Sequence, residues 1–366
     1  MSSKYILEMN HIEKDFFGNK VLKDVSIKVK PGEIVAWIGE NGAGKSTIMN
    51  ILFGMPAIQQ TGGFKGSVLI DGEEVHIKSP IEAMKYGIGM VHQEFMLVPS
   101  LTVSENMMLR EEPKKGIFIN RAKAVEETRR IARMYQLPID PDTGVEALPV
   151  GMKQRVEILK ALYRGARILI LDEPTAVLTP QETEELFRQL ILLKEHGHTV
   201  IFISHKIREV KQICDRITIM KNGQSMGVYD VKDITESDIS RLMVGREVKM
   251  DLEKKQARPR DVVLRVEHLY HGYGEGKLKV NDVSFTVRSG EILGIAGVEG
   301  NGQRELLECI TGLRPIQRGK IRIKRHDVSG MSIRNIRDIA KTAYIPQDRL
   351  LFGVASEATI KENLLA

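Results

Sequence analysis

The sequence is poor in cysteine and in metal-ligand patterns. Its 366 residues include only two cysteines, Cys214 and Cys309, and neither lies near a second thiol or a histidine at metal-ligand spacing. This argues against a disulfide framework or a zinc site, and we expect both thiols to be reduced. The nine histidines include no pair at the spacing of a metalloprotease helix, which further disfavours a transition-metal site.

Long hydrophobic runs are also missing. The longest apolar stretches, around residues 168–171 and 200–203, have the length of strands. They fall far short of the roughly 18 residues that a membrane-spanning helix needs. The first ten residues lack a basic start followed by an apolar core, so they do not resemble a secretory signal. We expect a cytoplasmic protein, in which any membrane role comes through partner subunits.

Charge of one sign is not concentrated anywhere in the chain. The net charge is +6, and Lys and Arg alternate with Glu in segments such as RAKAVEETRRIARM, residues 121–134. This mixture is typical of a solvated helix face, so we expect no nucleic-acid partner. A hydrophobic fraction of 42% and a charged fraction of 28% describe an ordinary globular protein, long enough for two domains.

The chain contains a long internal repeat. Residues 21–54 match residues 279–312, so that Gly297 lies 258 positions after Gly39. Each copy predicts an opening strand, a turn, a buried strand, a glycine-rich loop and a helix. The period is too long for a stacked repeat protein, so it indicates two tandem copies of one domain.

The repeat suggests domain boundaries. We expect a first domain over residues 1–250, a polar linker over residues 251–261 and a second domain over residues 262–366. The final KENLL matches SENMM of residues 104–108, so we expect the second copy to be incomplete at its C-terminal side.

In the first copy, short apolar strands alternate with amphipathic helices such as residues 181–195 and 206–214. This alternation predicts an α/β domain with a mainly parallel sheet. The segment GSVLIDGEEVHI, residues 66–77, predicts an additional antiparallel strand pair.

The motif GENGAGKS, residues 39–46, has the spacing of a phosphate-binding loop between a strand and a helix. A chance glycine-rich turn is the alternative, which the flanking strand and helix disfavour. In such a loop, backbone N–H groups point at the β-phosphate of ATP, a lysine reaches the β- and γ-phosphates, and a hydroxyl binds Mg²⁺. The predicted cofactor-binding residues on this segment and directly after it are Gly39, Asn41, Gly42, Ala43, Gly44, Lys45, Ser46 and Thr47.

A carboxylate pair follows the buried strand in RILILDEPTAVLT, residues 167–179. Asp172 is placed to hold Mg²⁺ through water, and Glu173 to polarise the attacking water. Taken alone, such a pair is more often a helix-capping turn. Together with the phosphate-binding loop it predicts an ATP-hydrolysing site at the carboxyl end of the sheet.

These residues resemble the ABC ATPase family, and more narrowly the double-domain ATPases of bacterial sugar and nucleoside importers. The resemblance covers essentially the whole chain and includes four further elements: VHQEFMLVPSLTVSEN with Gln93, the signature-like LPVGMKQR of residues 148–155, EPTAVLTPQE, and IFISHK with His205. It implies a P-loop α/β fold with an antiparallel β subdomain and a helical subdomain, in tandem with an incomplete second copy.

The resemblance also implies residue roles. Gln93 would bind Mg²⁺ and sense the γ-phosphate, and His205 would contact that phosphate. Phe17 resembles the aromatic residue that stacks on adenine, although Phe16 is adjacent and either could belong to the core. The signature residues would be Pro149, Val150, Gly151 and Met152.

The sequence departs from the family pattern in two places. The second glycine-rich loop has Gln303 and Arg304 where the first has Lys45 and Ser46, so hydrolysis there is not expected, although weak nucleotide binding remains open. Pro149 stands where the family has serine, and it offers neither a hydroxyl nor an N–H group. In the family, the two domains pair head to tail, and each ATP lies in a composite site between the phosphate-binding loop of one domain and the signature of the other. Both defects would therefore fall in the same composite site.

The resemblance implies an energy-coupling ATPase of an importer for a nucleoside or a simple sugar, peripheral at the cytoplasmic face of the membrane. Its direct partners would be transmembrane permease subunits, with a solute-binding protein as an indirect one and dimerisation through the first domain as a possibility. Two alternatives are an ABC-family ATPase of translation or DNA repair and a catalytically inactive binding module. The short linker disfavours an ATPase of translation, which usually carries a long helical arm between its domains, and an ATPase of DNA repair, which carries coiled-coil or zinc insertions.

Overall fold

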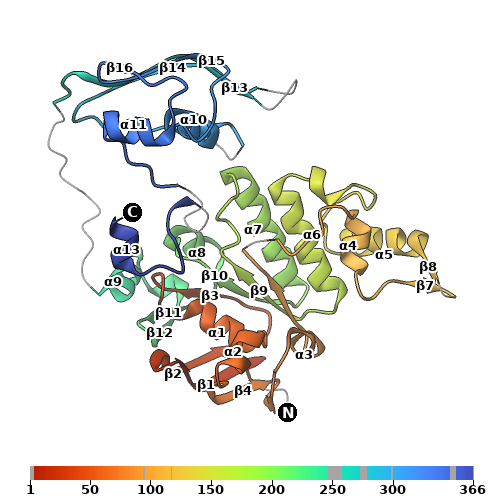
Figure 1. Ribbon diagram of the computed structural model, residues 1–366. Coiled ribbons are helices and arrows are strands. Elements are labelled where there is room, and N and C mark those ends of the chain that lie inside the picture. The colour runs from red at the N-terminus through yellow and green to blue at the C-terminus, as the bar shows by residue number, and fades with distance from the viewer. Residues whose placement is uncertain are drawn as a thin grey trace. The chain divides into compact units, whose positions relative to one another are not determined.

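The computed structural model describes residues 4–93, 95–116, 118–245, 258–272, 278–297, 300–346 and 352–365. The chain divides into two compact units, Met1–Met250 and Asp251–Ala366 (Figure 1). Most of the expected linker, residues 251–257, lies outside the described residues. The domain boundaries therefore stay a prediction, and each unit is described by itself.

A six-stranded sheet forms the centre of the first unit, in the order β12-β11-β3-β10-β9-β6. Five strands are parallel and β12 pairs with β11 in antiparallel register. The strands are β3 (Ile34–Ile38), β6 (Ile88–Val91), β9 (Ile168–Asp172), β10 (Thr199–Ile203), β11 (Arg216–Lys221) and β12 (Gln224–Asp230). This confirms the predicted mainly parallel sheet, including the apolar strands at residues 168–171 and 200–203.

Both faces of this sheet are covered, since every residue of its central strands β3 and β10 is buried. The helices are α1 (Lys45–Leu52), α2 (Pro56–Gln60), α3 (Pro80–Lys85), α7 (Pro180–Glu195), α8 (Ile207–Ile213) and α9 (Glu236–Val244), with a short 3-10 turn, η2 (Val231–Asp233). The predicted helices at residues 181–195 and 206–214 are thus confirmed as α7 and α8.

An antiparallel sheet in the order β2-β1-β4-β5 packs on the side of α1. Its strands are β1 (Leu7–Phe16), β2 (Asn19–Val29), β4 (Lys65–Ile70) and β5 (Glu73–Val75). Alternate residues of β1, such as Leu7 and Met9, are fully buried in one apolar cluster with Ile48 of α1. The predicted strand pair within residues 66–77 is confirmed as β4 and β5.

A helical subdomain follows β6 and precedes β9. Figure 1 shows α4 (Val103–Met108), α5 (Arg121–Met134) and α6 (Val150–Tyr163) packed beside one another. A small hairpin of β7 (Lys114–Lys115) and β8 (Phe118–Ile119), and the 3-10 turn η1 (Val145–Ala147), complete it. The charge-rich residues 121–134 form α5, whose few buried residues include Ile131 and Ala132, as expected for a solvated helix.

The second unit repeats the antiparallel sheet, in the corresponding order β14-β13-β15-β16. Its elements are β13 (Val262–Gly272), β14 (Leu278–Arg288), β15 (Arg318–Ile323), β16 (His326–Asp327), α10 (Gln303–Ile310), α11 (Ile333–Ala340) and α13 (Ile360–Leu365). The repeat extends to individual contacts. The His11 Nδ1 to Asp24 Oδ1 pair at 2.7 Å in the first unit recurs as His268 to Asp282 at 2.8 Å in the second.

One sequence prediction for the second copy is wrong. Residues 291–297 were expected to form a buried strand like β3, but the structure assigns no strand there, and Ile292 is 96% exposed whereas Ile34 is fully buried. The physical reason is that β3 lies between β10 and β11. In the described part of the second unit no strand pairs with residues 291–297. Their backbone therefore forms no inter-strand hydrogen bonds, and their side chains are not covered by a packed layer.

Candidate nucleotide-binding site

The glycine-rich loop of the first copy connects β3 to α1, as predicted. A side chain on Gly39 would collide with the carbonyl oxygen of Met220, so only glycine allows this close approach. Gly44 has φ +101°, and a Cβ there would lie 2.6 Å from a methyl carbon of Leu22. These constraints produce the tight turn that directs backbone N–H groups into the loop. Ala43 is buried beneath it, while Asn41, Gly42 and Ser46 are exposed and Thr47 is half-buried.

The loop lysine is folded back onto the loop itself. Lys45 is 7% exposed, and its Nζ donates to the carbonyl oxygens of Gly39 at 2.7 Å and Glu40 at 3.1 Å. Burial lowers the pKa of the Lys45 ammonium, and the negative charges of Glu173 and Asp172 act in the opposite direction. The structure therefore brings the predicted lysine and both predicted carboxylates into one electrostatic group.

The first carboxylate, Asp172, ends β9 at the carboxyl edge of the sheet. Burial raises the pKa of Asp172 and the neighbouring charge of Glu173 raises it further, whereas Lys45 lowers it. A cation bound here would favour the ionised carboxylate for the same electrostatic reason. The donor set predicted for Mg²⁺, which comprises the hydroxyl of Ser46, the carboxylate of Asp172 and the amide oxygen of Gln93, consists of the hard oxygen ligands that this ion prefers.

The second carboxylate is held by a histidine and a strained backbone. Glu173 Oε1 lies 2.9 Å from Nδ1 of His205, which directly follows Ser204 at the end of β10. Glu173 has φ +47°, a left-handed conformation that costs a residue with a Cβ roughly 1–2 kcal/mol. Its other oxygen, Oε2, is buried and has no hydrogen-bond partner among the described residues. Such an oxygen can accept a hydrogen bond from a water molecule.

Two predicted residues lie apart from this group. Gln93 is exposed, two residues after β6, and the β6 residue Val91 is paired with Leu171 of β9, which places Gln93 at the same sheet edge as Asp172. Phe17 lies at the tip of the β1–β2 hairpin and is 93% exposed. Phe16, the alternative, is partly buried against the core with Lys14 Nζ 4.6 Å from its ring centroid.

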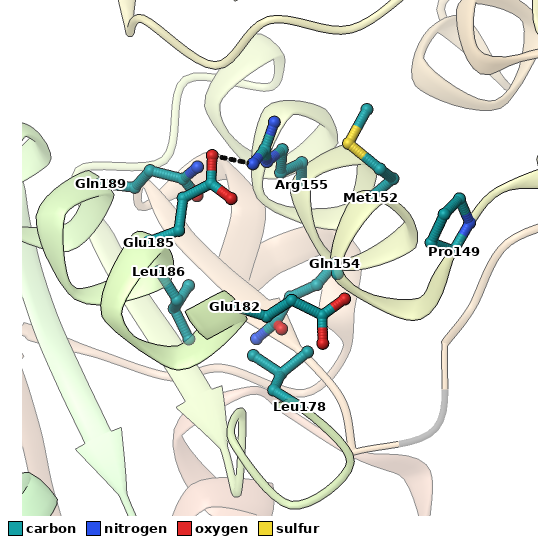
Figure 2. A pocket seen from close by; sticks show the side chains of 10 residues that line it. Pro149, Met152, Gln154, Arg155, Leu178, Glu182, Glu185, Leu186 and Gln189 are labelled. Atoms are coloured by element: carbon teal, nitrogen blue, oxygen red, sulfur yellow. Dashed lines mark ion pairs between the residues drawn. The ribbon is translucent and has the colours of Figure 1, made fainter. Parts of the chain in front are cut away.

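The signature segment begins α6. Pro149 is the residue before the helix, and its carbonyl oxygen accepts hydrogen bonds from the N–H groups of Met152 and Lys153. A proline is tolerated here because the first N–H groups of a helix have no partner within the helix. Val150, Gly151 and Met152 form the half-buried first turn. This turn and the facing residues of α7 line a cavity of about 180 Å³ (Figure 2).

Sequence reasoning missed a polar network next to Glu173. Thr175 is 1% exposed, and its Oγ1 donates to Glu209 Oε2 at 2.5 Å. Lys206 Nζ donates to the Thr175 carbonyl oxygen at 3.0 Å. Gln154 of α6 donates to the Pro174 carbonyl oxygen at 2.9 Å. A signal for Gln154 was present, because it shares the apolar face of α6 with Ile158, where a polar side chain needs a buried partner.

In the loop of the second copy, Gly300 and Gly302 keep the positive φ of Gly42 and Gly44, but the lysine is replaced by Gln303. A Cβ on Gly297 would collide with the side-chain amide of Gln303, which therefore lies against the loop as Lys45 does in the first copy. Arg304 Nε donates to Glu308 Oε1 at 2.8 Å, and Arg314 pairs with the same carboxylate. The charge of Arg304 is therefore shared with a carboxylate of its own helix. Val298 and Glu299 lie outside the described residues, and weak nucleotide binding at this loop stays a prediction.

No helix in the described ranges is long and apolar enough to cross a membrane. Both halves of the chain match the same family model, described as ABC transporter. The matched residues are 22–176 in the first half and 280–363 in the second.

Curated relatives match nearly the whole chain. The guanosine import ATP-binding protein NupO of Bacillus subtilis is 44% identical over 99% of this chain and 70% of its own length. The nucleoside import ATP-binding protein NupA of Lactococcus lactis is 42% identical over 100% of this chain and 71% of its own length. The xylose import ATP-binding protein XylG of Thermoanaerobacter pseudethanolicus is 42% identical over 99% and 72%.

Solved structures share the fold. The ADP conformation of MJ1267, an ATP-binding cassette of an ABC transporter, aligns with a TM-score of 0.56 and 28% identity, over 66% of this chain and 96% of that one. Three observations support one family. The site brings a loop lysine, an acidic pair and a histidine together. The family model matches both halves of the chain, and the relatives align along nearly all of it. The chain belongs to the ABC transporter family of ATP-binding proteins.

Proposed function

We propose that this chain is the ATP-hydrolysing, energy-coupling subunit of an importer for a small polar solute, a nucleoside or a simple sugar. The observation that supports it most directly is the grouping of Lys45, Asp172, Glu173 and His205 at the carboxyl edge of one sheet. The named relatives are ATP-binding proteins for guanosine, nucleoside and xylose import. These names disfavour the alternative of an ATPase of translation or DNA repair.

The chemistry follows from the residues of the loop and the sheet edge. The N–H groups of Gly42, Ala43 and Gly44 and the ammonium of Lys45 would bind the phosphates of ATP. Ser46, Asp172 and Gln93 would hold Mg²⁺, which when bound neutralises charge on the β- and γ-phosphate oxygens.

The remaining residues act on the water and on the base. Glu173 accepts a hydrogen bond from the attacking water through Oε2, while His205 fixes Oε1 and reaches toward the γ-phosphate. Phe17, exposed at its hairpin tip, offers a face for stacking on adenine.

The signature requires a second domain. Residues 149–152 form the start of α6, whereas the glycine-rich loop connects β3 to α1. We propose that the first domains of two chains pair and place Pro149 to Met152 of one opposite Lys45 of the other. In the cell the chain would associate with transmembrane permease subunits at the cytoplasmic face of the membrane, and with a solute-binding protein only through them. We expect no nucleic-acid partner.

Co-purification tests the assignment. The chain, tagged and expressed together with permease subunits of a nucleoside or sugar importer from the same organism, is expected to retain them through detergent extraction. Its ATPase rate in vesicles should rise when the matching binding protein carries a nucleoside or sugar. Recovery of ribosomes or DNA in place of permease would count against a transport role.

The proline of the signature gives a second test. Pro149→Ser is expected to raise the ATPase rate by up to about a hundredfold, because it restores a hydroxyl and an N–H donor near the charge of the transition state. The rate should also rise more steeply than in proportion to protein concentration, since each site needs two chains. Pro31→Ser, at an exposed turn before β3, is the control and should change neither property. An unchanged rate in a Pro149→Ser dimer would contradict the composite site.

A further inference from the structure

The turn between β9 and α7, residues 173–179, is held by the signature helix. Gln154 is 3% exposed, and its Nε2 donates to the carbonyl oxygen of Pro174 at 2.9 Å. Pro174 is itself buried and directly follows Glu173. Figure 2 shows the side chains of Gln154, Glu182 and Leu178 gathered on one side of the cavity between α6 and α7.

A second contact joins the same two segments. Glu182 forms a capping box with Thr179, in which Glu182 Oε2 accepts from the Thr179 N–H at 2.9 Å and from its hydroxyl at 2.9 Å. The other oxygen, Oε1, lies 3.0 Å from the position that a Cβ on Gly151 would occupy. Gly151, in the first turn of α6, is therefore packed directly on the carboxylate of Glu182, which caps the end of the segment 173–179.

The opposite side of the turn is attached to the segment that carries His205. Thr175 bonds to Glu209 of α8 at 2.5 Å and to Lys206 at 3.0 Å, and Lys206 pairs with Glu209 at 2.9 Å. The turn thus has polar contacts on both sides. One set leads to the signature, and the other leads to the histidine that binds Glu173.

We propose that Gln154 is a positioning residue that couples the signature segment to the catalytic carboxylate of the same chain. Glu173 has a left-handed backbone, so the direction of its side chain depends on how the following peptide is held. Gln154 holds the next peptide, Pro174–Thr175, and Pro174, whose φ is fixed by its ring, connects that peptide to Glu173. A displacement of α6, when the signature engages the nucleotide of a partner chain, is passed through Gln154 to Pro174 and so to Glu173. This coupling rests on the proposed function and extends it by connecting the two composite sites of a dimer.

Gln154→Leu removes the donor while nearly keeping the side-chain volume. The matched control is Gln189→Leu, which changes a glutamine that is 6% exposed on the α7 wall of the same cavity. We expect Gln154→Leu to lower kcat about tenfold, because the Pro174 carbonyl loses its donor, and to leave KM for MgATP within about twofold. Gln189→Leu should leave both constants unchanged.

Amide hydrogen exchange of the nucleotide-free chain gives a measurement that does not depend on activity. Exchange over residues 175–179 should be roughly tenfold faster in Gln154→Leu and unchanged in Gln189→Leu. Equal exchange and equal kcat in the two variants would overturn the coupling, as would a parallel loss of kcat, MgATP affinity and thermal stability in Gln154→Leu. A failure of the proposed function looks different, since the unmodified chain would then bind MgATP no better than Lys45→Ala.

Discussion

Lys45→Ala is expected to abolish tight binding of MgATP. Lys45 is the only lysine in the loop, and its ammonium lies where the β- and γ-phosphates would be held. Charge-assisted hydrogen bonds to phosphate are among the strongest that a side chain forms, and the loop sequence has no second lysine to replace them. Because burial already disfavours the charged lysine, its removal should not unfold the unliganded chain.

Thermal unfolding with and without nucleotide measures this effect. At a MgATP concentration about 100 times the dissociation constant, the unmodified chain should gain about 2.7 kcal/mol in its free energy of unfolding. Lys45→Ala should gain nothing measurable. Lys65→Ala, at an exposed position of β4, should behave as the unmodified chain does. If Lys45→Ala were stabilised by MgATP to the same extent, the nucleotide site would have to lie elsewhere.

Glu173→Gln should remove hydrolysis and preserve nucleotide binding. Glutamine has nearly the same size, but it lacks the negative charge that polarises water and pairs with His205. General-base groups contribute roughly 10² to 10⁴ in rate, so we expect a loss within that range. The free energy of MgATP binding should stay the same or improve, because a like charge near the phosphates is gone.

Single-turnover release of phosphate, measured beside equilibrium binding, separates the two properties. Glu195→Gln, an exposed change at the end of α7, is the control and should keep the parent rate. A Glu173→Gln chain that hydrolyses ATP at the parent rate would show that another group activates the water.

The sequence predicted the elements whose conformation is decided locally. The loop of residues 39–46 could be identified because Gly39 and Gly44 occupy positions that only glycine accepts, and because a strand and a helix flank it. The helix predicted over residues 181–195 is likewise local, because its apolar spacing gives one face that packs on the core. The antiparallel and parallel sheets followed from the spacing of apolar residues.

The sequence could not predict contacts that depend on distant chain segments. Gln154 and Pro174 are 20 positions apart, and one of the two bonded groups is a backbone carbonyl that leaves no trace in residue identity. The failed strand at residues 291–297 has the same origin. Its apolar residues match those of β3, but a central strand exists only when neighbours complete its hydrogen bonds and cover its faces.

The contacts of Lys45 with its own loop change how binding there should be understood. Two backbone carbonyls already serve as an internal ligand for the ammonium. For the proposed function, binding is then an exchange reaction, in which phosphate oxygens displace carbonyl oxygens and only the difference between the two sets contributes to affinity. Charged phosphates gain from this exchange and a neutral nucleoside does not. The loop would thereby discriminate between ATP and a transported nucleoside, although ATP itself contains a nucleoside.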